Sequence, residues 1–179
     1  MKKVLPYLLF LTGLSTLNQA TAQTHLGYVL GGDPLVTDQW VMSPNAQVNG
    51  TDLALVQNVG GQSGYIYYDQ VANLTKCAQF DVDFDFRTNN SAVNPTEGLA
   101  FWYSSNLPNG FQAGNGLGLP TNLAGFAAII DAFDNDNNAN NPLLSVRTFT
   151  GNNYVEGSTT GQVGPDVTLP AAVTNGTWH

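Results

Sequence analysis

Positively charged residues are scarce in this 179-residue chain. Lys and Arg together number 5, against 13 Asp and Glu, which gives a formal net charge of -8 at pH 7. Proteins that bind nucleic acid need clustered Lys and Arg to contact phosphates, and attraction to anionic lipid surfaces needs the same residues. The composition therefore excludes nucleic acid as a partner and argues against strong binding to an anionic membrane surface.

Cysteine and histidine are almost absent. A single cysteine, Cys77, allows no internal disulfide, and the two histidines, His25 and His179, lie near the two ends of the chain. A catalytic triad or a Cys–His pair would need a histidine among the central residues. Cys77 falls in a strand-like stretch, where we expect a buried free thiol.

The first 22 residues are typical of a secretory signal peptide. Two lysines precede the apolar run Val4–Leu14, which is too short to cross a bilayer as a stable span. Ala20-Thr21-Ala22 has the small residues of a cleavage site, so we expect cleavage after Ala22. The alternative is an uncleaved membrane anchor. We interpret the chain as a signal peptide (1–22) and one domain (23–179) in the lumen of the secretory pathway or outside the cell.

The remaining sequence favours β-strands. Segment 80–86 alternates apolar and acidic residues, which predicts a strand with its aromatic side chains toward a core and three carboxylates toward solvent. Runs 98–103 and 125–130 are continuously apolar and fit central strands covered on both faces. Shorter strand-like runs occupy three further segments: 53–56, 65–68 and 144–149. No convincing helical period follows the signal peptide, so the pattern predicts an all-β protein with two packed sheets.

Two loops are too long for simple hairpins: 104–123, rich in Gly, Asn and Pro, and 131–142, almost wholly Asp and Asn. The second loop places Asp131, Asp134 and Asp136 close together in sequence, and these carboxylates repel one another unless a cation lies between them. Calcium takes about six to eight oxygen ligands from carboxylates, amides and carbonyls, which this loop supplies. An EF-hand is excluded because its Gly and final Glu are missing at the required spacing. The alternative without metal is a solvated, Asn-rich turn.

Two motifs, in this order, resemble the legume-type (L-type) lectin domain. The first is Glu97-Gly98-Leu99-Ala100-Phe101-Trp102-Tyr103, and the second is the 131–142 loop, which starts Asp-Ala-Phe-Asp-Asn-Asp and ends in Asn-Asn-Pro. Trp40 and the stretch 53–87 also fit, so the resemblance covers roughly residues 30–163. The branch that the motifs resemble most closely is the mannose-binding cargo receptors of the early secretory pathway.

The resemblance implies a jelly-roll β-sandwich, the concanavalin-like lectin fold, with a calcium-supported sugar site at one end. It implies that Asp131, the Phe133 carbonyl and Asn135 ligate the main calcium. Four polar residues of the same loop would serve a second calcium: Asp134, Asp136, Asn140 and Asn141. Glu97 and the Asn135 amide would contact the hydroxyls of a mannose-like sugar. Such shallow sites bind modestly, so we expect glycans or glycoproteins of the high-mannose type as partners and avidity from a homo-oligomer.

Three departures from the family pattern leave a second function open. Glu97 replaces an Asp and is one methylene longer. The family's Tyr-Asp-His and later Asp become Tyr154-Val155-Glu156 and then Ser158-Thr159-Thr160, so a calcium ligand and a sugar-contacting His are missing unless Glu156 substitutes. The family's last sugar-contacting loop would lie beyond His179, so we expect a fragment without its C-terminal strands. The alternative is an adhesive or structural module of a larger surface protein with a degenerate sugar site.

An enzyme is the remaining class of function. Glycoside hydrolases share this sandwich architecture and need two carboxyl groups about 5 to 9 Å apart. The chain contains only two Glu, Glu97 and Glu156, on different segments, and calcium would keep Asp131 ionised and unsuited to acid catalysis. We therefore expect no catalytic residues. Because the predicted site lacks histidine, we also expect calcium binding to persist from neutral pH to about pH 5.5.

Overall fold

The structure is a computed structural model, and it describes residues 29–57, 59–69, 81–88, 96–135, 137 and 140–179. Three predictions fall outside these residues: the signal peptide (1–22), the buried thiol of Cys77 and the calcium ligand Asp136. Within the described ranges, no helix combines the length and the apolar character needed to cross a membrane.

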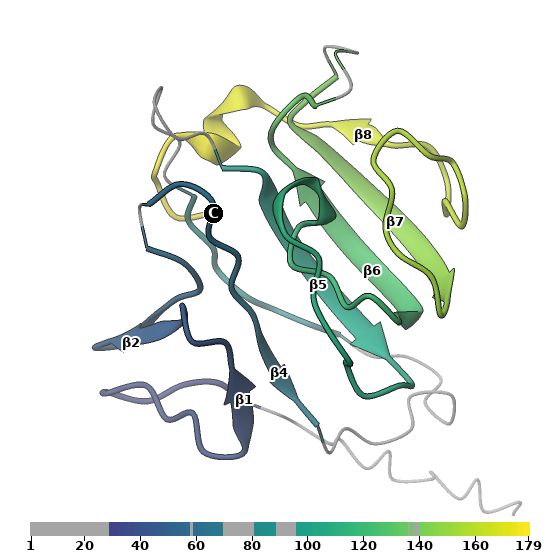
Figure 1. Cartoon of the computed structure of the whole chain (residues 1–179). Helices are drawn as coiled ribbons and strands as arrows, with labels where there is room; N and C mark the ends of the chain where they lie inside the picture. Colours follow the sequence, from purple (N-terminus) through teal and green to yellow (C-terminus); the bar gives the residue numbers. More distant parts are fainter. Residues whose placement is uncertain (1–28, 58, 70–80, 89–95, 136, 138–139) are drawn as a thin grey trace, which may run out of the picture.

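The described residues form strands and short 3-10 helices, with no α-helix among them (Figure 1). The strands are β1 (Trp40–Met42), β2 (Gln47–Asn49), β3 (Asp52–Ala54), β4 (Ile66–Tyr68), β5 (Gly98–Ser104), β6 (Ala124–Asp131), β7 (Leu143–Thr150) and β8 (Val167–Thr168). The 3-10 helices are η2 (Gly114–Gly116) and η3 (Ala171–Thr174). Strands β5, β6, β7 and β8 form one antiparallel sheet in that order, and β1 with β4 and β2 with β3 form two antiparallel pairs.

Strands β5, β6 and β7 form the most extensive pairing among the described residues. Their sequences are rich in aromatic and branched aliphatic residues, which fit the surface of a pleated sheet. The register pairs Gly98 with Asp131 and Ser104 with Gly125, and Asp131 also pairs with Leu143. The start of β5, the end of β6 and the start of β7 therefore lie at the same end of the sheet (Figure 1).

One face of this sheet forms the hydrophobic core. Its buried side chains come from β6, β7 and the neighbouring loops: Leu119, Leu123, Ala127, Ile129, Phe149 and Tyr154. Leu119 and Leu123 belong to loop 105–123 and are fully buried. The loop keeps its shape by backbone hydrogen bonds, in which the N–H groups of Gln112 and Gly118 donate to the carbonyls of Leu119 and Gln112, both at 2.9 Å. Loop 105–123 is thus a covering layer of the core.

The opposite face of the sheet is only half covered. Side chains of β5, β6 and β7 line an apolar hollow of about 270 Å³ together with Val82 and Phe84. Residues 81–86 have exposed carboxylates, as predicted, but form no assigned strand, and Val82 and Phe84 are 45% and 51% exposed. The expectation of strands buried on both faces is therefore correct for one face only.

Aromatic contacts join the pair β1–β4 to the large sheet. The Tyr65 and Phe111 rings are stacked with centroids 3.5 Å apart, and the Tyr67 and Trp102 ring centroids are 5.9 Å apart. All four side chains are half-buried. These tyrosines and Trp102 therefore pack between elements and leave the end of the sheet as the place for a polar site.

Candidate functional site

The candidate site lies at the end of the sheet where β5 begins, β6 ends and β7 begins (Figure 1). Asp131, the last residue of β6, lies between Gly98 of β5 and Leu143 of β7. The backbone N–H of Ala132 donates to the Glu97 carbonyl at 2.8 Å and extends the ladder by one step. The loop that follows β6 therefore leaves the sheet directly beside Glu97.

Gly98 allows β5 and β6 to approach each other at this end. Its φ is +148°, and a Cβ atom at this position would lie 2.1 Å from the carbonyl oxygen of Ile130. A side chain would force the two strands apart or shift their register. The glycine of the Glu-Gly-Leu-Ala motif thus holds Glu97 next to the end of β6.

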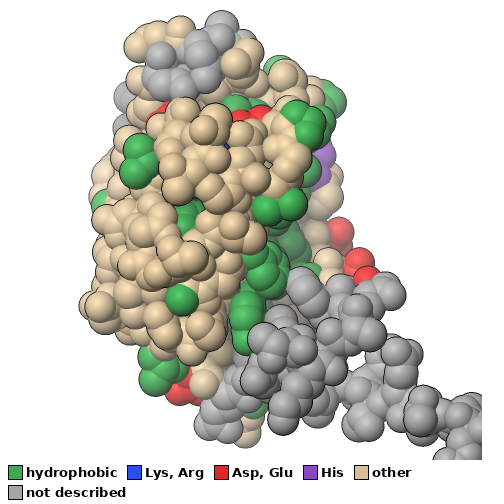
Figure 2. Space-filling model, turned by 90° about the vertical axis from the view of Figure 1, so that its right-hand side faces the viewer, with side chains coloured by type: hydrophobic (Ala, Val, Ile, Leu, Met, Phe, Trp, Pro, Cys, Tyr) green, Lys and Arg blue, Asp and Glu red, His purple; other side chains and the backbone are tan. Residues whose placement is uncertain are grey.

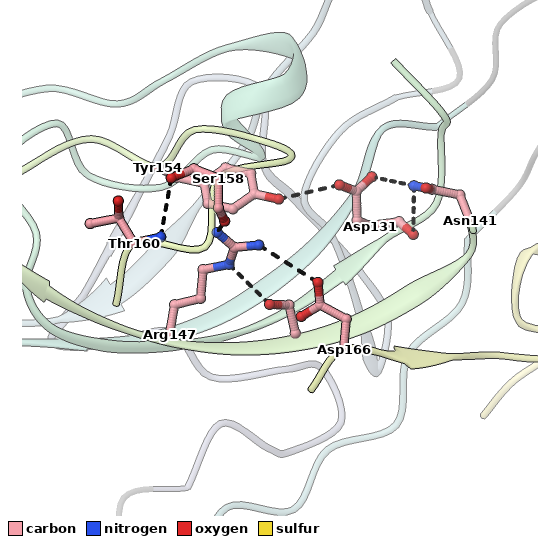
Figure 3. Close-up of polar contacts among 8 residues, drawn as sticks. Asp131, Asn141, Arg147, Tyr154, Ser158, Thr160 and Asp166 are labelled. Carbon is pink, nitrogen blue, oxygen red and sulfur yellow. Dashed lines mark hydrogen bonds and ion pairs between the residues drawn. The ribbon is translucent and has the colours of Figure 1, made fainter. Parts of the chain in front are cut away.

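Asp131 is a buried carboxylate, 2% exposed, that accepts hydrogen bonds from two side chains (Figure 3). Asn141 Nδ2 donates to its Oδ1 at 2.9 Å, and the Tyr154 hydroxyl donates to its Oδ2 at 3.3 Å. The same Asn141 amide also donates to the carbonyl oxygens of Asp131 and Phe133, at 3.3 Å and 2.9 Å. Three oxygen atoms therefore converge on one electropositive NH₂ group.

Burial strongly affects the ionisation of Asp131. Its pKa is raised from 3.8 to about 6, mainly because burial removes hydration and next because of the negative charge of Glu156. Hydrogen bonds from Tyr154 and from the Phe133 backbone act in the opposite sense but are weaker. Burial also raises the pKa of the Tyr154 hydroxyl, so this group remains a hydrogen-bond donor. Asp131 is a buried negative charge that a bound cation would stabilise.

Glu97 and Asn135, the two predicted sugar-binding residues, are in direct contact. Nδ2 of Asn135 donates to Oε2 of Glu97 at 2.8 Å, and the Asn135 backbone N–H donates to Oε1 of Glu156 at 3.2 Å. Asn135 is exposed, whereas both glutamates are half-buried. Figure 2 shows acidic side chains at the upper end, the right-hand edge and the lower end of its face, and almost no Lys or Arg on that face.

The other predicted ligands differ in their positions. The Phe133 carbonyl accepts hydrogen bonds from Asn141 and from the Asn135 backbone N–H, the latter at 3.1 Å. Asp134 is half-buried and Asn140 is exposed. Among the residues that the structure describes, no three Asp, Glu, His or Cys side chains are arranged to hold a metal ion. The predicted main site would thus use one carboxylate, one carbonyl and one amide, and the described ranges cover the residues of the predicted second site only in part.

A model of the legume-like lectin family matches residues 25–165, a range that contains the whole candidate site. The chain belongs to the legume-like lectin family. No curated protein and no solved structure matches the chain.

Membership of this family identifies a carbohydrate-binding, non-catalytic domain. The predicted all-β jelly-roll sandwich is confirmed, because the described part of the lectin is nearly all sheet and the family match covers most of the chain. The predicted L-type lectin family is confirmed as well. Legume-type lectins generally bind metal ions, so the donor set at the end of β6 can be assessed against calcium.

The residues around Asp131 fit a calcium ion in their chemistry. Calcium prefers oxygen ligands, and the Asp131 carboxylate and the Phe133 carbonyl already converge on the Asn141 amide group. Rotation of that amide by half a turn would replace its NH₂ group by its oxygen. The NH₂ group of Asn141 therefore lies at a place whose surrounding oxygen atoms suit a cation.

The structure adds three residues to this lectin site. The sequence alone assigns Tyr154 and Arg147 no role in it, and it leaves open whether Glu156 replaces a missing family residue. Glu156 stands where the family has His, and the structure places its carboxylate beside Asn135. Tyr154 and Arg147 lie beneath the site, where Tyr154 donates to Asp131 (Figure 3). The sequence signal for Arg147 is that it is the only charged residue of β7.

Proposed function

We propose that this lectin domain binds mannose-type glycans in a calcium-dependent manner, with Glu97 and Asn135 contacting the sugar. The observation that carries the proposal is the contact between these two side chains at the exposed end of the sheet, 2.8 Å apart. The carboxylate accepts hydrogen bonds from sugar hydroxyls, and the amide can both donate and accept. Their mutual hydrogen bond fixes both groups before a sugar arrives, which reduces the entropy lost on binding.

Calcium would hold the 131–142 loop in the binding conformation. Asp131, the Phe133 carbonyl and Asn135 are the proposed ligands of the main ion, with Glu156 beside them in place of the missing family ligand. A second ion would use four residues of the loop: Asp134, Asp136, Asn140 and Asn141. The buried charge of Asp131, with its pKa of about 6, supports this proposal because a cation would offset the repulsion from Glu156.

The cellular context of the lectin follows from its first residues. We propose that residues 1–22 are a cleaved signal peptide and that the domain 23–179 acts in the lumen of the secretory pathway or outside the cell. The motifs around Glu97 and Asp131 support a relation to the cargo-receptor lectins. High-mannose glycoproteins are the proposed partners, bound through several copies of the domain.

Calorimetric titration of the metal-free chain with calcium, followed by an oligomannose glycan, tests the proposal. We expect glycan binding only after calcium is added, and no binding of a galactose-terminated glycan. Asp131→Asn should remove calcium binding, and Glu97→Gln should remove glycan binding while calcium binding stays. Asp83→Asn is a matched control because its exposed carboxylate lies on a different segment.

Two outcomes would contradict the proposal in different ways. Absence of calcium binding at millimolar concentration would exclude the metal site. Calcium binding without any glycan binding would instead favour an adhesive or structural module whose loop is fixed by calcium.

A further inference from the structure

Arg147 is a buried charge beneath the lectin site. It lies on β7, is 4% exposed and points to the core face of the sheet. Its Nε donates to Ser145 Oγ at 3.0 Å, Nη1 donates to the carbonyl oxygen of Ser158, and Nη2 lies 3.8 Å from Oδ2 of Asp166 (Figure 3). Its guanidinium carbon lies 5.3 Å from the ring centroid of Tyr154.

Neutralisation by Asp166 does not explain this burial. The Asp166 side chain is 32% exposed, and the separation of 3.8 Å is long for a strong charge-assisted hydrogen bond. Burial of a guanidinium group is unfavourable unless its donors are satisfied, and here a neutral carbonyl and a hydroxyl satisfy two of them. The arginine thus forms most of its contacts with the segment that follows β7.

That segment supplies two side chains to the site. The Tyr154 hydroxyl donates to Asp131, and the Glu156 carboxylate accepts from the Asn135 backbone. Arg147 contacts the segment both before and after Glu156. It packs on the ring of Tyr154 and donates a hydrogen bond to the carbonyl oxygen of Ser158. The planar guanidinium group therefore holds the segment at two points that flank Glu156.

The same group also faces the acidic side of the site. Asp131, Glu156 and Asp166 line a small cavity of about 30 Å³, and among the described residues that line it Arg147 is the only cation. A lysine could supply the charge but not the fork of donors, because its ammonium group is a single point at the end of a flexible chain.

We propose that Arg147 is a positioning residue of the lectin site. It holds segment 154–158 so that Tyr154 and Glu156 face the residues proposed to bind calcium and sugar. This inference rests on the proposed function. Arg147 touches neither ligand and acts through Tyr154 and the Ser158 carbonyl. Its removal should weaken binding even in molecules that remain folded.

The test compares Arg147→Met with Arg87→Met in the full chain. Arg87 is a matched control, because it also packs on an aromatic ring, 4.8 Å from the ring centroid of Trp178, but is exposed on another segment. We expect Arg147→Met to raise the calcium Kd at least about tenfold. Backbone hydrogen exchange should rise in 154–160 and stay unchanged in β6, whereas Arg87→Met should change neither measurement by more than about twofold.

A second variant covers the case in which Arg147→Met fails to fold. Arg147→Lys keeps the buried charge, and we expect it to raise the calcium Kd about threefold to tenfold, because the charge alone does not hold the segment. The positioning role would be overturned if either variant, per folded molecule, bound calcium with the wild-type Kd and showed wild-type backbone hydrogen exchange in 154–160. Absence of binding by the wild-type chain would overturn the proposed function as well, so the two failures are distinguishable.

Discussion

The two long loops of the lectin, 105–123 and 131–142, both contain several Asn residues but differ in what holds them. Loop 105–123 inserts two fully buried leucines into the core and closes on itself with backbone hydrogen bonds. Loop 131–142 is held by polar side chains, through the contacts of Asn141 with Asp131 and of Asn135 with Glu97. Most of its described side chains are exposed or half-buried.

This difference separates a loop that belongs to the fold from one that belongs to the site. A buried leucine contributes about 1.5 to 3 kcal/mol by leaving water, whereas an intramolecular hydrogen bond contributes about 1 kcal/mol. The first loop is stable without a ligand. The second is held weakly by its own contacts, and the proposed calcium would contribute the missing stabilisation.

The largest effect is expected in the first loop. Leu119→Ala should lower the free energy of unfolding by about 2 to 5 kcal/mol, because it removes a fully buried side chain and leaves a cavity. Urea denaturation of the metal-free protein measures the loss. A change below about 1 kcal/mol would show that this loop is not a part of the core.

Calcium should act on the second loop only. At a calcium concentration about one hundred times its Kd, the free energy of unfolding should rise by about 2.7 kcal/mol. Hydrogen exchange should slow in 131–142 and hardly change in 105–123. Equal protection of both loops would contradict the distinction drawn here.

The third effect concerns pH. Because burial raises the pKa of Asp131 to about 6, protons compete with calcium earlier than for an ordinary carboxylate, and the sequence-based expectation of constant binding to pH 5.5 needs revision. We expect the calcium Kd to rise about tenfold from pH 7 to pH 5, and less than about twofold from pH 7 to pH 6. Calcium titrations at these three pH values measure it. A calcium Kd that stays constant from pH 7 to pH 5 would contradict the raised pKa of the buried Asp131 carboxylate.

The stability of the metal-free protein should change with pH in the opposite direction. The folded-state pKa of Asp131 lies above its ordinary value, so its contribution to stability is present below about pH 3.8 and is lost as pH rises through about 6. Asp131→Asn should remove this contribution to the pH dependence.

The smallest effect is expected at Asn137 in the second loop. This residue has φ +56°, a left-handed conformation that Asn and Gly adopt more readily than other residues. Asn137→Ala should destabilise the calcium-bound protein by about 1 kcal/mol, and Asn137→Gly should change it by less than about 0.5 kcal/mol. Thermal unfolding with saturating calcium compares the two, and equal values would show that the backbone at this position relaxes.

Much of the sheet could be predicted from local patterns. The apolar runs of β5 and β6 are strong signals, the strand-like run 144–149 is a shorter one, and the structure places strands at all three. Segment 80–86 has an equally clear alternation but forms no strand in its described part. Alternation identifies which side chains share a face, whereas strand pairing depends on a partner that the local sequence does not reveal.

The site could be predicted in part, because its residues lie in two recognisable motifs. The structure brings Glu97 and Asn135 into contact, and their role in sugar binding stays a prediction. The raised pKa of Asp131 could not be predicted, because it arises from burial and from Glu156, which lies far along the chain. Arg147 could be singled out as the one charged residue of β7, but its contacts depend on how the segment after β7 folds back.

The side-chain amide of Asn141 has a consequence for the speed of calcium uptake. It donates hydrogen bonds to the oxygens of Asp131 and Phe133 that are proposed to ligate the ion. Calcium entry then requires this amide to rotate away or turn its oxygen inward, so association includes a conformational step. The observed rate of uptake would therefore level off as the calcium concentration rises, at the rate of amide rotation.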